Sequence, residues 1–91
     1  MANIARVNVT SQWQNLEDVI EGFTPEVDSQ YELQNTGARD LLIYEGATAP
    51  ADIDGFVVRV YETAKLTKKD GEFWFVRTKA EETTTANIGT L

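Results

Sequence analysis

The stretch QYELQNTGARDLLIYE, residues 30–45, decides the fold class of this chain. In its first half, Tyr31, Leu33 and Asn35 alternate with polar residues, and this period of two is typical of a strand with one buried face. The run Asn35-Thr-Gly37 then predicts a turn. Residues 40–45 follow as a second strand that is apolar on both sides in its middle, which is typical of a central strand.

Other segments carry the same signal. Strands are predicted at Ile4–Thr10, Phe56–Tyr61 and Glu72–Arg77. In the last of these, Trp74 faces away from Phe73 and Phe75, because neighbouring side chains of a strand point to opposite faces. The pair Asp70-Gly71 precedes this strand and is typical of a tight hairpin turn. Residues 46–55 are expected to form a loop.

Two segments leave alternatives open. In Ser11–Ile20, apolar residues at helical spacing predict one or two helical turns, but a loop pinned by a buried Trp13 fits equally well. The Thr-rich stretch 81–91 predicts either a final strand of the sheet or an arm that lies across a neighbouring subunit.

Length and pattern together predict one all-β domain over residues 1–91. We expect a small antiparallel β-sandwich or barrel with extended N- and C-terminal arms, at residues 1–12 and 81–91, because the short strands are separated by turn signals about every ten residues. A domain of 91 residues has a small core, and with no Cys it has no disulfide to support it. Oligomerisation is the remaining common source of stability.

Composition argues against catalysis. The chain has neither His nor Cys, so it lacks the usual proton shuttle, zinc ligands and activated nucleophiles, and Ser11 and Ser29 have no imidazole to activate them. We therefore expect no enzyme, no catalytic residues and no cofactor. The run Asp52-Ile-Asp54-Gly55 resembles part of a calcium loop, but the twelfth position is Thr63 in place of the closing Glu. No metal site is predicted.

The net charge of −7 argues against nucleic acid as a partner, because such binders need a basic patch. Three lysines, Lys65, Lys68 and Lys69, form either a small basic spot or, as we expect, solubilising groups at a hairpin tip. No apolar stretch is long enough for a membrane span, and the N-terminus lacks the apolar core of a secretory signal.

The aromatic residues are the best candidates for a binding surface. Because strand 72–77 carries large apolar residues on both faces, both faces must be covered, either by a second sheet or by a partner chain. Trp74 is expected in the core. The predicted partner interface consists of Phe73, Phe75, Trp13 and Tyr61.

The order of residues along the chain also resembles that of a known group of proteins. Its elements are Trp13-x-x-Leu16, Gly22, Tyr31-Glu-Leu-Gln-Asn35-Thr-Gly37, Leu42-Ile-Tyr-Glu45, Pro50, Gly55 and Phe73-Trp-Phe-Val-Arg77. This order, which spans residues 13–77, is similar to that of many small tailed-phage virion proteins. The resemblance implies a β-sandwich or barrel module, often trimeric, that decorates or cements a capsid or sits at the base of a fibre or spike.

We therefore expect a non-enzymatic bacteriophage structural protein, made in the host bacterial cytoplasm and located in the virion. Its expected partner is the shell of major capsid protein, with a tail, fibre or spike-base adaptor as the alternative. A homo-oligomer, such as a trimer, is a further expectation. Two hypotheses come from other classes: a carbohydrate-binding module that stacks sugars on Trp13, Trp74 and a tyrosine, and an acidic inhibitor that mimics a charged surface.

Overall fold

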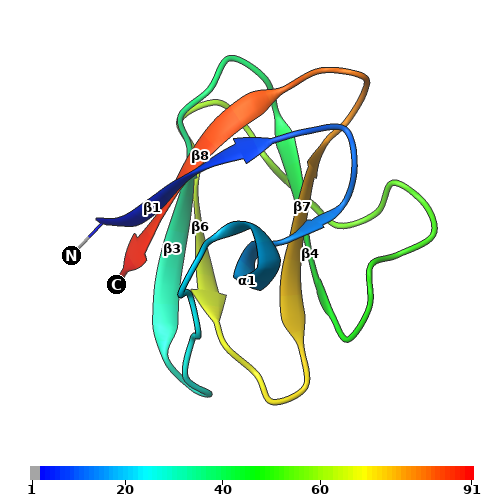
Figure 1. Cartoon of the computed structure of the whole chain (residues 1–91). Helices are drawn as coiled ribbons and strands as arrows, with labels where there is room; N and C mark the ends of the chain where they lie inside the picture. The colour runs from blue at the N-terminus through cyan, green and yellow to red at the C-terminus, as the bar shows by residue number, and fades with distance from the viewer. Residues whose placement is uncertain (1–2) are drawn as a thin grey trace.

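Two antiparallel sheets of four strands each face one another in the computed structural model, which describes residues 3–91 (Figure 1). The all-β sandwich predicted from the sequence is thereby confirmed. One sheet has the order β1-β8-β3-β6 and the other β2-β7-β4-β5. The strands are β1 (Asn3–Val9), β2 (Gln14–Asn15), β3 (Gln30–Asn35), β4 (Leu41–Gly46), β5 (Phe56–Val58), β6 (Thr63–Thr67), β7 (Phe73–Thr78) and β8 (Thr84–Thr90).

The core lies between the two sheets and follows the alternation read from the sequence. Tyr31, Leu33 and Asn35 of β3 are all buried, and so are Trp74 and Val76 of β7. Since each strand presents every second residue to the opposite sheet, the two inner faces fill the sandwich with apolar side chains. Strand β4 pairs with β7 on one side and β5 on the other, which confirms its predicted central position.

The first and last strands both belong to the first sheet. Strand β8 lies between β1 and β3 and pairs with both. Of the two alternatives for the C-terminal stretch, the structure therefore has the closing strand of the chain's own sheet. Met1 and Ala2, at the start of the predicted N-terminal arm, lie outside the described residues. In Figure 1 the two termini lie on one side, while the green loop 47–55 projects on the other.

The strand predicted at Phe56–Tyr61 is wrong in its second half. Strand β5 ends at Val58, and a turn follows in which Glu62 donates its backbone N–H to Arg59 O at 2.9 Å. Tyr61 has a φ of 66°, which no strand residue adopts. The turn transfers the chain to the other sheet, where β6 begins at Thr63. Strand β6 was not among the strands predicted from the sequence.

The turn at Asp70-Gly71 is confirmed as a tight turn but does not close a hairpin. Gly71 has a φ of 75°, and Glu72 N donates to Lys69 O at 3.2 Å. The flanking strands β6 and β7 belong to different sheets, so this turn also connects the two layers.

Of the two alternatives at Ser11–Ile20, the structure has the helical turn, and Trp13 is only partly buried. A two-residue strand, β2, pairs with β7, and the short helix α1 (Leu16–Val19) follows with the side chain of Asn15 accepting from Glu17 N at 3.0 Å. Leu16 and Ile20 are buried at the end of the sandwich. The described residues include no apolar helix of membrane-spanning length.

Asn35 explains why the turn after β3 needs the sequence Asn-x-Gly. Its buried amide donates to Arg39 O at 2.7 Å and to Val58 O at 2.9 Å. Its Oδ1 accepts from Gly37 N and from Thr84 Oγ1, both at 3.1 Å. One side chain thus joins strands of both sheets and holds the end of β5.

Candidate protein-interaction surface

Phe75, the first of the predicted interface residues, is covered by the chain itself. It lies on the outer face of β7, but only 8% of its surface is exposed. Directly paired with it are Tyr44 on β4 and Asn15 on β2. Leu42 of β4 is also buried, and neither Leu42 nor Phe75 belongs to the core cluster between the sheets. Phe75 is therefore not open to a partner in this structure.

Trp13 belongs to this covering layer. Its ring packs against Tyr44 with the centroids 6.3 Å apart, and the guanidinium of Arg77 lies 5.8 Å from the ring centroid. The indole N–H donates to Asp52 O at 3.2 Å, which ties the loop 47–55 to this face. Trp13 keeps partial exposure, so it lies at the rim of any surface that includes this loop.

Phe73 is half-buried and supports an ion pair. The ammonium of Lys68 lies 4.5 Å from the Phe73 ring centroid, 2.9 Å from Glu17 Oε2, and also donates to Glu72 O. Lys68 is buried, so its expected role as a solubilising group at a hairpin tip is wrong. Its chemistry is used inside the molecule, where it joins the α1 segment to the turn between β6 and β7.

Tyr61 is the most exposed member of the predicted set, with 72% of its surface exposed. Its backbone is held at both ends of the residue: Tyr61 N donates to Asn35 O at 2.7 Å, and Tyr61 O accepts from Gln34 Nε2 at 3.2 Å. A bulky side chain at positive φ is strained, and such strain persists only where surrounding bonds fix it. The ring itself projects into solvent.

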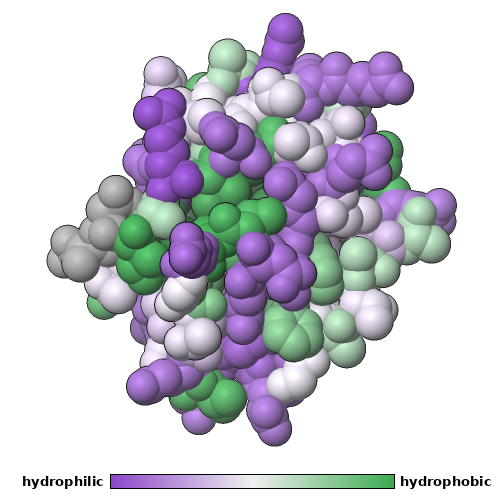
Figure 2. Space-filling model, in the orientation of Figure 1, coloured by the Kyte–Doolittle hydropathy of each residue, from purple (hydrophilic) through white to green (hydrophobic). Residues whose placement is uncertain are grey.

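The segment 53–61 collects exposed apolar side chains around Tyr61. Phe56 is 79% exposed, the highest fraction of any large apolar residue in the described chain, and Ile53 and Val57 are also exposed. Half of the large exposed apolar side chains of residues 3–91 come from these nine residues. We call this segment the β5 segment. The face seen in Figure 2 is by contrast mostly hydrophilic, with apolar groups in separate patches.

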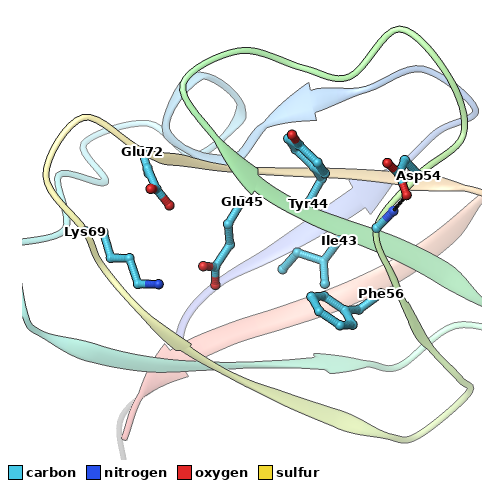
Figure 3. Close-up of a pocket in the computed structure, with 8 residues that line it drawn as sticks. Ile43, Tyr44, Glu45, Asp54, Phe56, Lys69 and Glu72 are labelled. Carbon is cyan, nitrogen blue, oxygen red and sulfur yellow. Dashed lines mark hydrogen bonds between the residues drawn. The ribbon is translucent and has the colours of Figure 1, made fainter.

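A cavity of about 440 Å³ adjoins the β5 segment. It lies between β4, the start of β5 and the turn between β6 and β7 (Figure 3). Three carboxylates line it, from Glu45, Asp54 and Glu72, together with the ammonium of Lys69 and the ring of Phe56.

The chain was compared with protein-family models, curated proteins and solved structures. No protein-family model, curated protein or solved structure matches this chain.

The structure therefore separates the four predicted interface residues. Trp13 and Phe75 both contact or pair with Tyr44 on the outer face of the second sheet. Phe73 lies against the ammonium of Lys68, and Tyr61 lies on the β5 segment. Phe56 was missed because it stood in the predicted strand Phe56–Tyr61, and Ile53 because it fell in the predicted loop 46–55. Within residues 3–91 no group of His, Cys, Asp and Glu is arranged to hold a metal ion.

Proposed function

We propose that this chain is a non-enzymatic structural protein of a tailed-phage particle that docks on the major capsid protein shell through its β5 segment. The resemblance of residues 13–77 to small tailed-phage virion proteins supports the location. The exposed β5 segment supports the mode of action. Self-association, for example as a trimer, is part of this proposal, as is assembly after synthesis in the host bacterial cytoplasm.

One observation carries the docking role: a strained tyrosine is presented to solvent. A bulky residue at positive φ costs on the order of 1–3 kcal/mol, and Gly or Asn at position 61 would lower that cost. Within residues 3–91 the Tyr61 side chain makes no hydrogen bond and no contact with another aromatic ring, and the residue is 72% exposed. An exposed aromatic ring that lowers stability is best explained by contact with a partner, since tyrosine is a frequent anchor of protein interfaces.

Two alternatives are less well supported. A tail, fibre or spike-base adaptor would use the same surface, and only the particle can distinguish it from a capsid-binding protein. A carbohydrate-binding module needs exposed rings, but Trp74 is 3% exposed and packs against Phe23 and Tyr31. That hypothesis keeps only the partly exposed Trp13 and two of the tyrosines, Tyr44 and Tyr61.

The proposal is tested on particles produced by the genome that encodes this chain. Mass spectrometry of gradient-purified particles should find the chain in a fixed ratio to the major capsid protein. Added chain should also bind particles from which it has been stripped. Absence from purified particles would sink the virion role.

Tyr61→Asn provides the matched variant for the docking surface. Asn tolerates positive φ, so we expect the free energy of unfolding to stay the same or rise by up to about 1 kcal/mol. Binding to stripped particles should fall about tenfold, as for loss of an interface anchor. Light scattering across micromolar concentrations tests self-association, and monomer throughout would count against the trimer.

A further inference from the structure

We infer that the cavity beside β5 receives an arginine side chain of the docking partner. This inference rests on the proposed docking role of the β5 segment and names the chemistry that the segment recognises. Three observations support it: the shape of the cavity, its charge and the position of one aromatic ring.

Phe56 occupies an inner-face position that no strand covers. It pairs with Ile43 of β4, and paired residues lie on the same face of a sheet. Ile43 is buried in the core, whereas Phe56 at the sheet edge is 79% exposed. The inner face of the second sheet therefore extends past the edge of the first, and the Phe56 ring is left as an open wall of the cavity (Figure 3).

The charge around this ring favours a cation. Glu45, Asp54 and Glu72 oppose the single ammonium of Lys69. The ion pairs found within residues 3–91 are Arg39–Glu82, Lys68–Glu17 and Lys79–Asp40, so none of them uses these four groups. Figure 3 shows Glu45 between the turn that carries Lys69 and Glu72 and the ring of Phe56.

Arginine fits this combination better than any other side chain. Its planar guanidinium stacks on an aromatic face and donates to carboxylates in the plane of the group. A cavity of about 440 Å³ is large enough for such a side chain. The occupant is thus an arginine from a segment of a partner protein that also contacts the exposed apolar groups of the β5 segment.

Lys69 lines the same cavity as the three carboxylates, although within residues 3–91 it forms no ion pair with them. Its removal should strengthen the site, because the incoming cation would no longer be repelled. Removal of Lys69 therefore tests the direction of the change in affinity as well as its magnitude, since loss of a group that only supports the structure would weaken binding.

The experiment is an NMR titration of the full chain with N-acetyl-arginine amide, followed through the backbone amide signals. N-acetyl-citrulline amide is the control, because it has nearly the same shape without the charge. We expect arginine to shift the signals of Gly55, Phe56 and Lys69 with a dissociation constant of about 1–10 mM, and citrulline to bind at least about fivefold more weakly. Equal shifts with both compounds, or no shifts at these residues, would overturn the inference.

Four variants locate the site. Phe56→Leu keeps an apolar group but removes the ring, and Glu72→Gln removes one charge; each should weaken arginine binding about threefold. Lys69→Gln should strengthen it about twofold. Glu81→Gln removes an exposed carboxylate that does not line the cavity, and it should change nothing. Equal effects of Glu72→Gln and Glu81→Gln would mean a general charge effect and no site.

The same experiments distinguish a wrong arginine site from a wrong virion role. If the chain binds stripped particles but Glu72→Gln and Phe56→Leu leave both that binding and the arginine titration unchanged, only the arginine site is refuted. If the chain is absent from particles, the virion role fails whatever the titration shows.

Discussion

Replacement of Asn35 by alanine is the most informative change to the fold, because one buried amide joins three segments. The amide makes four hydrogen bonds, to Arg39 O, Val58 O, Gly37 N and Thr84 Oγ1. Alanine removes all of them and leaves no polar atom in their place. Water cannot substitute easily, since Asn35 is fully buried.

The expected cost follows from the groups left without a partner. A buried donor or acceptor that loses its hydrogen bond costs about 1–3 kcal/mol. Val58 O and Thr84 Oγ1 are the two whose partner is hardest to replace, because both of these bonds are buried, whereas Gly37 N also donates to Thr85 O at 3.1 Å. We therefore expect Asn35→Ala to lower the free energy of unfolding by about 3–5 kcal/mol. A domain of this size has a total of only about 5–14 kcal/mol.

Urea denaturation followed by tryptophan fluorescence measures this loss, since Trp74 is buried among Phe23 and Tyr31. With a slope of about 1–1.5 kcal/mol per molar urea, the midpoint should fall by about 2–5 M. Asn8→Ala, at an exposed position on the edge strand β1, is the control and should change the free energy by less than about 0.5 kcal/mol.

A second variant keeps the test decisive if Asn35→Ala does not fold. Thr84→Val removes only one of the four bonds and should cost about 1–2 kcal/mol. A loss below about 1 kcal/mol for Asn35→Ala would refute the reasoning, because it would mean that the amide is not the joint between the sheets.

Three further predictions concern stability. Gly37→Ala should cost about 2–4 kcal/mol, because its methyl group would overlap Thr84 Oγ1 and lie 2.5 Å from Thr85 N; a cost near zero in urea denaturation would contradict the packing. Gly71→Ala should cost only about 1 kcal/mol, since its φ is positive but nothing lies within 4 Å, and a cost equal to that of Gly37→Ala would contradict this distinction. Lys68→Met should cost about 1–3 kcal/mol by leaving Glu17 unpaired, and Glu17→Gln added to it should restore part of the loss; calorimetry that finds no such recovery would show that the ion pair is not the cause.

The layers of the fold were predictable from the sequence where burial follows a period of two. Strand β3 shows this most clearly, since Tyr31, Leu33 and Asn35 all point inward. The missed boundary lies at Tyr61. Its positive φ is fixed by a hydrogen bond that Tyr61 N donates to Asn35 O and one that Tyr61 O accepts from Gln34 Nε2. Both partners are distant in the sequence, and a bulky aromatic residue gives no local signal for such a conformation.

The candidate surface was harder to predict than the fold. The sequence indicated that both faces of strand 72–77 must be covered, and Phe75 is indeed buried. It could not indicate that the cover on the outer face comes from this chain, because the contact of Trp13 with Tyr44 and with Asp52 O depends on how the loop 47–55 folds back. Conversely, the sequence gives no sign that Phe56 is exposed, because it stands in a predicted strand. It is exposed because the inner face of the second sheet extends past the edge of the first at this point.

Electron microscopy of the intact particle tests the central proposal most directly. We predict a small β-sandwich on the capsid shell, with the β5 segment (residues 53–61) against the major capsid protein and an arginine of that protein beside Phe56. A map in which this sandwich is absent, or in which the β5 segment faces solvent while another surface contacts the shell, would contradict it.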